Sequence, residues 1–341
     1  MREVTTWTRL VESNAAVRFL DINLRGPAQV IFQDNPLTGA FFIVAVAWGA
    51  IRHGTPVLAV GAIVALLIST ITAYLLRADA ASLRQGLFGF NGFLVGVAVP
   101  SYLGNTASMW VLLVVGAAVS TVVMLAISSI MKTWGVPALT FPFVLTTWFV
   151  LLSAYSFGHT HISGVVPPAL AKEQVIGEAA LTAPAAFEAW LRGPAQVFLI
   201  DNWVSGILVV IGLLCSSRWA AGFALLGSAI ALGLSVAFGA SGHSIKAGLF
   251  GFSPVLTAVG LGCVFYTPSG RVAAYAILGT VFTVFVQAAL DAAVLPFGIP
   301  TLTAPFVFAT WLFLLPKADL KPHPHQPIAA GLFASKVSTH D

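Results

Sequence analysis

The heptapeptide Leu24-Arg25-Gly26-Pro27-Ala28-Gln29-Val30 recurs letter for letter as Leu191-Arg192-Gly193-Pro194-Ala195-Gln196-Val197. Two further blocks recur in the same order. Gly86-Leu87-Phe88-Gly89-Phe90 returns as Gly248-Leu249-Phe250-Gly251-Phe252, and Leu139-Thr140-Phe141-Pro142-Phe143 returns as Leu302-Thr303-Ala304-Pro305-Phe306. Blocks that recur in one order at nearly one spacing indicate a duplicated half. We therefore predict a first half-repeat over 1–158, an inter-repeat linker over 159–186, a second half-repeat over 187–316 and a tail over 317–341.

The composition places both halves in a lipid bilayer. Of the 341 residues 58% are hydrophobic and only 8% are charged, with a mean hydropathy of +0.94. Soluble domains carry about 25% charged residues, and the apolar runs 55–76 and 108–131 are each long enough to cross ~30 Å of hydrocarbon. We predict an all-α polytopic membrane protein. Its net charge of +4 needs no nucleic acid to explain it, because membrane proteins keep Lys and Arg on their cytoplasmic side.

Each half contains six apolar segments, one of which is interrupted by glycines. The interrupted segments are 83–102 and 248–262, and broken segments at matching positions of two halves are typical of re-entrant helices that line a pathway. Five crossings then remain in each half. Five is an odd number, so we predict that the second half is inverted relative to the first, around a single central pore. The Lys and Arg bias favours both termini in the cytoplasm of a multi-pass inner (plasma) membrane protein.

The repeated heptapeptide brings a glutamine to the same position in each half. Gln29 and Gln196 are candidates for polar pore lining, because polar groups at membrane depth usually face protein or water. Hydrogen bonding between helices is an equally good interpretation of both. The residues that follow are expected to cap the next helix, with Asp34 or Asn35 as the cap before Pro36 in the first half and Asp201 and Asn202 in the same role in the second.

The Leu-Thr-x-Pro-Phe blocks place a hydroxyl and a proline together. Because proline donates no backbone hydrogen bond, we expect Pro142 and Pro305 to leave two backbone carbonyls free to face a central pore, with Thr140 and Thr303 adding hydroxyls near the midplane. The alternative is that these prolines only kink two helices. Aromatic and aliphatic pairs at helical spacing, Phe90 with Leu94 and Phe252 with Leu256, are candidates for the pore wall or for ordinary packing.

Several classes of function are excluded by what the sequence lacks. No P-loop, His-Glu-x-x-His or Gly-x-Ser-x-Gly pattern is present, which argues against ATP drive, catalytic residues and an enzyme. The few acidic residues at depth, Asp21, Glu188 and Asp291, suggest no ion-coupled carrier. The histidines lie in loops, segment ends and tails, so we expect no metal site and no cofactor. A neutral lining predicts a small, neutral, polar solute.

The repeated blocks, followed in the first half by Asn35-Pro36-Leu37-Thr38-Gly39, resemble the urea transporter family over about residues 15–316. The resemblance implies two inverted halves, each with five transmembrane helices and one re-entrant pore helix, and a homotrimer with one pore per subunit. It also implies passive, channel-like passage of urea through a slot lined by oxygens and aromatic rings. The implied lining is Gln29, Val30, Phe32, Phe90, Leu94, Thr140, Gln196, Val197, Leu199, Phe252, Leu256 and Thr303.

Leu199 departs from the expected pattern, because an aromatic residue is expected at the position that matches Phe32. Two alternatives to a urea channel stay open. One is a channel for short amides or other small neutral solutes, and the other is a membrane sensor or assembly subunit that transports nothing.

Overall fold

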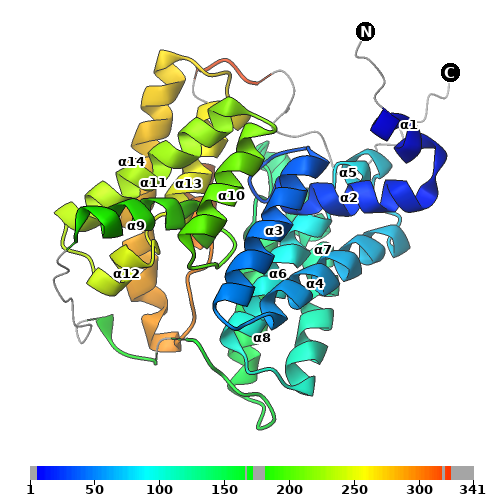
Figure 1. Ribbon diagram of the computed structural model, residues 1–341, viewed down its shortest axis with the longest axis horizontal. Coiled ribbons are helices and arrows are strands. Elements are labelled where there is room, and N and C mark those ends of the chain that lie inside the picture. The colour runs from blue at the N-terminus through cyan, green and yellow to red at the C-terminus, as the bar shows by residue number, and fades with distance from the viewer. Residues whose placement is uncertain (1–5, 166, 172–180, 317–318, 324–341) are drawn as a thin grey trace.

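The computed structural model describes residues 6–165, 167–171, 181–316 and 319–323 (Figure 1). Over these residues the chain is helical, apart from loops and two isolated bridges, Leu103 with Ile162 and Tyr266 with Pro322. The predicted all-α class is confirmed. Much of the predicted linker, 172–180, and most of the predicted tail, 324–341, lie outside the described residues.

The order of helices in the first half is repeated in the second. The first half contains α1 (Thr6–Ser13), α2 (Ala15–Gln29), α3 (Pro36–Arg52), α4 (Val57–Leu75), α5 (Ala80–Arg84), α6 (Gly89–Tyr102), α7 (Ala107–Trp134) and α8 (Phe141–Ala154). The second contains α9 (Ala183–Gln196), α10 (Trp203–Leu214), α11 (Arg218–Ala237), α12 (Gly242–Lys246), α13 (Phe252–Val259), the π-helical turn Gly260–Val264, α14 (Gly270–Val294), the 3₁₀ turn Leu295–Phe297 and α15 (Ala304–Leu314). Each predicted interrupted segment contains a turn, at 85–88 or 247–251, but α6 then continues without a break through its glycines to Tyr102.

The helix starts follow from the sequence. The Asn35 side chain accepts from the first turn of α3, and Asn202 does the same for α10, as a capping asparagine does. Of the two residues predicted as caps in each half the asparagine is therefore the cap, whereas Asp34 and Asp201 pair with arginines. The repeated glycines Gly39 and Gly206 are required by close packing, because a Cβ at either position would lie within 2 Å of a carbonyl oxygen, that of Leu24 or Leu191.

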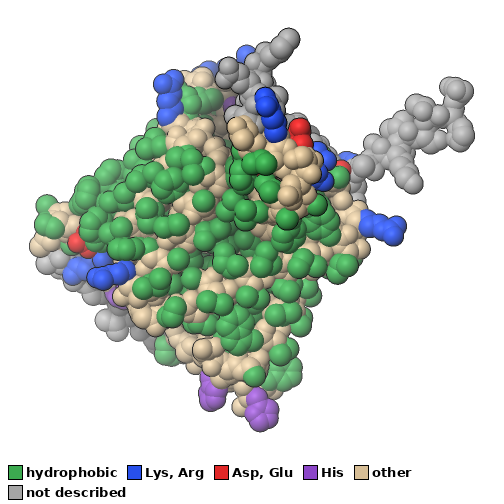
Figure 2. Space-filling view, turned by 45° about the vertical axis from the view of Figure 1, so that its right-hand side comes forward, with side chains coloured by type: hydrophobic (Ala, Val, Ile, Leu, Met, Phe, Trp, Pro, Cys, Tyr) green, Lys and Arg blue, Asp and Glu red, His purple; other side chains and the backbone are tan. Residues whose placement is uncertain are grey.

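Within the described part of the chain, four helices are long and apolar enough to cross a membrane, judged by length and composition: α4, α7, α11 and the continuous helical segment Gly270–Phe297. Shorter apolar helices, α3, α8, α10 and α15 among them, accompany these four. Figure 2 shows one face of the molecule covered mainly by hydrophobic side chains, with Lys, Arg, Asp, Glu and His at its edges. This is the surface of a multi-pass membrane protein, whose charged residues stay out of the hydrocarbon.

The two halves meet along α3 and α10, which lie side by side in the centre of Figure 1. Thr38 Oγ1 on α3 donates to the carbonyl of Gly212 at 2.7 Å, and Ser205 Oγ on α10 donates to the carbonyl of Ala45 at 2.7 Å. Thr38 matches Ser205, and Ala45 matches Gly212, so each half makes the same contact with the other.

A second reciprocal contact joins the halves near the Leu-Thr-x-Pro-Phe blocks. Trp148 Nε1 on α8 donates to the carbonyl of Pro300, and Trp311 Nε1 on α15 donates to the carbonyl of Pro137, both at 2.8 Å. Each indole therefore fixes the loop that leads into the other half's final helix.

Candidate functional site

The two repeated threonines meet at the centre of the molecule. Thr140 Oγ1 and Thr303 Oγ1 lie 2.7 Å apart in a hydrogen bond, although 163 residues separate them in the chain. Each side chain is only 2% exposed. Each threonine immediately precedes a helix, α8 or α15, and follows a leucine with positive φ, Leu139 at 55° and Leu302 at 50°.

Positive φ is uncommon for a residue with a branched side chain and is held only where the surroundings enforce it. The tryptophan bonds to Pro137 and Pro300 supply such an anchor two residues before each leucine. The backbone turns sharply at both leucines, and this turn directs the Thr140 and Thr303 hydroxyls towards each other.

The expected free carbonyls are absent. Pro142 and Pro305 lie in the first turn of α8 and α15 rather than within a helix, where a missing N–H leaves no intrahelical bond unmade. The carbonyl of Ala138 accepts from the N–H of Phe141, and that of Thr301 from Ala304, both at 3.2 Å. The prediction of a midplane carbonyl pair is therefore wrong, and so is the alternative of two kinked helices. The hydroxyls are the polar groups that meet here.

The Phe32 ring of the first half packs against aromatic rings of the second half. Its φ is +60°, and its ring lies 5.9 Å from that of Phe306 and 5.5 Å from that of Phe265, in edge contacts. Phe306 lies three residues beyond Thr303. The matching residue Leu199 has the same backbone twist, with φ +56°, so the duplication preserves the backbone although the ring is lost.

Both glutamines are tied to the interrupted segments. Gln29 Nε2 donates to the carbonyl of Gln85, and Gln196 Nε2 donates to the carbonyl of Ala247, each at 2.8 Å. Gln85 and Ala247 directly follow α5 and α12. The alternative of hydrogen bonding between helices is thus observed for both side chains, each of which is buried with 8% exposed.

The arginines of the repeated heptapeptide are neutralised by carboxylates. Arg25 pairs with Asp21 at 2.6 Å and with Asp34, and Arg192 pairs with Glu188 at 2.9 Å and with Asp201 at 3.2 Å. Asp291 accepts from Gln287 and Thr301. The acidic residues predicted at membrane depth therefore all have protein partners.

The remaining predicted lining residues are buried. These are Val30, Phe90, Leu94, Val197, Phe252 and Leu256, each at most 9% exposed. Sequence analysis missed the residue next to Phe90, Asn91, whose carboxamide reaches the first turn of α8. The sequence signal for Asn91 is a polar amide side chain inside a glycine-interrupted apolar segment, where a buried amide needs a hydrogen-bond partner. The matched pair Trp148 and Trp311 was also missed, although its spacing equals that of the two threonines.

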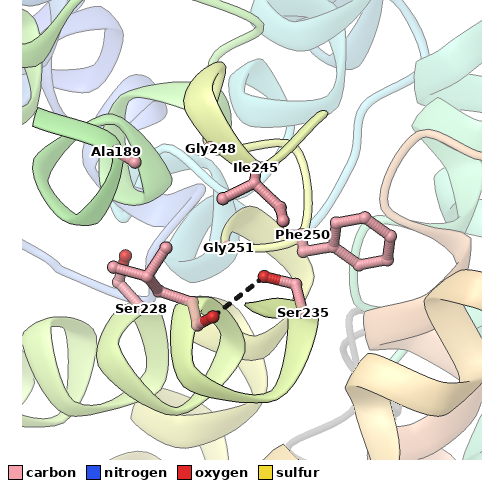
Figure 3. A pocket seen from close by; sticks show the side chains of 8 residues that line it. Ala189, Ser228, Ser235, Ile245, Gly248, Phe250 and Gly251 are labelled. Carbon is pink, nitrogen blue, oxygen red and sulfur yellow. Dashed lines mark hydrogen bonds between the residues drawn. The ribbon is translucent and has the colours of Figure 1, made fainter. Parts of the chain in front are cut away.

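A small cavity of about 10 Å³ lies elsewhere, beside α11 and α12 (Figure 3). Its lining includes Ala189, Ser228, Ser235, Gly248 and Gly251. It has room for about one water molecule and none for a larger solute. The site with matched contributions from both halves is the threonine pair and the residues that flank it.

A family model described as urea transporter matches residues 20–318. The chain is 29% identical over 319 residues to urea transporter 1 of Ovis aries and to that of Capra hircus, and 28% identical to that of Mus musculus. In each case the match covers 92% of this chain and 81% of the relative.

Proposed function

The chain belongs to the urea transporter family, and from this premise we propose that it carries urea passively across a cell membrane by a path that runs between Thr140 and Thr303. The observation that carries the proposal is the buried hydrogen bond between these two hydroxyls, contributed by matched positions of the two halves. The family consists of transporters, and we propose no chemical step and no cofactor.

The threonine pair suits a small neutral solute. The hydroxyls touch each other, so passage requires them to separate and to exchange their mutual bond for bonds to the solute. A hydroxyl both donates and accepts, which matches the amide donors and the carbonyl acceptor of urea. Such an exchange of one set of hydrogen bonds for another carries little net free energy, as rapid passage requires.

The helix termini disfavour a cation at the same place. Both α8 and α15 begin directly after a threonine of the pair, and the N-terminal end of a helix carries a partial positive charge. Two such ends meeting in a dry environment oppose ammonium and favour the carbonyl oxygen of urea. Each arginine is paired with two carboxylates, Arg25 with Asp21 and Asp34 and Arg192 with Glu188 and Asp201, so these clusters do not repel a cation, and we assign its exclusion to the two helix ends alone.

We further propose that the halves are inverted relative to one another, with five membrane crossings and one re-entrant helix each. The reciprocal bonds of Thr38 and Ser205, and of Trp148 and Trp311, support a two-fold relation between the halves. Five crossings in each half make an even total for the whole chain, which places both termini on one side, and the Lys and Arg bias assigns that side to the cytoplasm.

The proposed lining extends from the threonine pair towards Gln29, Val30 and Phe32 in one direction and Gln196, Val197 and Leu199 in the other. The rings and side chains of Phe90, Leu94, Phe252 and Leu256 form the walls of a flat slot. Each subunit contains a complete path, and three subunits form the proposed homotrimer in the inner (plasma) membrane. Chemical cross-linking in native membranes tests the trimer.

Stopped-flow light scattering with the purified full chain in liposomes tests transport. We expect urea flux far above that of empty vesicles, saturating only at high urea concentration. Flux equal to that of empty vesicles would overturn the proposal and favour a membrane sensor. Acetamide and methylurea, given to the same vesicles, distinguish a urea channel from a channel for short amides.

A further inference from the structure

Four matched positions surround the start of the final helix of each half, and their chemistry differs between the halves. In the first half they are Asn91, Met124, Ser128 and Ala138, and in the second they are Ser253, Gln287, Asp291 and Thr301. The backbone is duplicated here while the polar groups are not. Each half therefore holds its threonine by different means.

In the first half one side chain holds the start of α8. Asn91 Oδ1 on α6 accepts from the N–H of Phe143 at 3.1 Å, and Asn91 Nδ2 lies 3.5 Å from Sδ of Met124 on α7. The first four N–H groups of a helix have no intrahelical acceptor, so the carboxamide satisfies one of them. Asn91 is 1% exposed, and its amide acts three residues beyond Thr140.

In the second half the start of α15 is held through the loop before it. Gln287 Nε2 on α14 donates to Thr301 Oγ1 at 2.9 Å and to Asp291 Oδ1 at 3.0 Å, and Thr301 Oγ1 donates to Asp291 Oδ1 at 2.9 Å. Gln287 and Asp291 are four residues apart and share one face of the helix. Thr301, tied to both, lies two residues before Thr303.

The side chain that matches Asn91 takes no part in this arrangement. Ser253 is fully buried, and its hydroxyl has no protein hydrogen-bond partner. Serine is shorter than asparagine by two heavy atoms. Thr283 on α14 donates to Thr257 on α13 at 2.9 Å, and this bond fixes the packing of the two helices. Ser253 lies one turn before Thr257, and Gln287 lies one turn after Thr283. The two residues are therefore at the same height, as Asn91 and Met124 are in the first half.

We propose that Asn91 in the first half, and Gln287, Asp291 and Thr301 in the second, are positioning residues that hold the two threonine hydroxyls in register at the constriction. Asn91 fixes the first turn of α8 after its threonine, whereas the second cluster fixes the loop before Thr303. The proposal deepens the proposed function, because it assigns the groups that keep the narrowest point of that path in shape.

The key variant is Thr301→Val, which keeps the side-chain shape and removes both hydroxyl bonds. We expect urea permeability about fivefold lower, the factor for one hydrogen bond to the solute lost when the Thr303 hydroxyl leaves its position. We also expect a lower ratio of urea to methylurea permeability, because the constriction loses its shape. Thr301→Ser, which keeps the hydroxyl, is expected to restore the ratio. Thr280→Val is the matched control, because Thr280 is a buried threonine of α14 whose hydroxyl donates to the carbonyl of Ala276 in its own helix.

A merely structural role gives a different result. Thr301→Val would then lower the amount of folded protein and the flux of both solutes equally, leaving the ratio unchanged, and this outcome would overturn the proposal. Gln287→Met introduces the residue of the first half and serves as a second variant if Thr301→Val does not fold. For Asn91, Asn91→Leu is expected to lower the ratio and Asn91→Asp, which keeps the acceptor, to preserve it.

A structure of Thr301→Val or Gln287→Met separates this proposal from urea transport itself. We expect the Thr140 and Thr303 hydroxyl oxygens to move beyond hydrogen-bond distance, whatever the protein transports. If they stay at the wild-type 2.7 Å, the positioning role is refuted even where urea flux is confirmed. If they separate and the wild type carries no urea, the positioning role stands and the transport proposal fails.

Discussion

Replacing the paired threonines by valine separates stability from transport. Valine has the shape of threonine without its hydroxyl. Thr140→Val leaves the Thr303 hydroxyl buried and unpaired, and an unpaired buried hydroxyl costs about 1–3 kcal/mol of stability. Thr303→Val does the same in reverse. The double variant leaves no hydroxyl unpaired, and replacing both partners by apolar groups of the same shape is nearly neutral.

Transport follows the opposite order. On the proposed path each hydroxyl offers urea one hydrogen bond at the narrowest point, worth about 1 kcal/mol net. Losing one raises the barrier by that amount and lowers flux about fivefold. Losing both raises it by about 2 kcal/mol and lowers flux about 30-fold. The double variant is therefore expected to be more stable than either single variant and to conduct less.

Thermal unfolding in detergent and stopped-flow urea flux in liposomes measure the two properties on the same preparations, with Thr280→Val as the matched control. If flux in the double variant recovered together with stability, the two hydroxyls would form no hydrogen bonds to urea during passage, and this result would refute the reasoning.

Three other properties are open to measurement. Gln29→Leu leaves the carbonyl of Gln85 without its side-chain donor, so we expect a loss of about 1–3 kcal/mol of stability, seen as a lower unfolding midpoint; an unchanged midpoint would contradict the helix-linking role. Phe32→Leu widens the slot and is expected to admit methylurea more readily, whereas Leu199→Phe narrows the matching wall and is expected to exclude it; equal effects on urea and methylurea would argue against a slot. Urea flux is expected to be the same with and without sodium or proton gradients, because Asp21 and Glu188 are ion-paired and Asp291 is held by hydrogen bonds from Gln287 and Thr301. A flux driven by either gradient would refute passive transport.

Most of the candidate site residues can be found in the sequence because they lie in blocks that recur in both halves. A repeated block shows which positions of the two halves match, so the sequence alone relates Thr140 to Thr303 and Gln29 to Gln196. The membrane class followed from the scarcity of charge, and the caps at Asn35 and Asn202 from local hydrogen bonding. These properties depend on composition or on a few neighbouring residues, which sequence reports directly.

The partners of the polar groups could not be predicted in the same way. The sequence does not predict that Pro142 lies in the first turn of α8, because the start of that helix depends on contacts with the other half. The turn at Leu139 sets where α8 begins, and Trp311 of the other half anchors the loop before this turn.

By itself the sequence determined a duplicated, membrane-embedded helical chain. Only the tertiary structure decided that Thr140 and Thr303 touch, and that Asn91 serves one half while Thr301 serves the other. The physical reason is that hydrogen bonds between distant residues are set by how whole helices pack. Two halves with the same backbone satisfy their buried polar groups through different side chains.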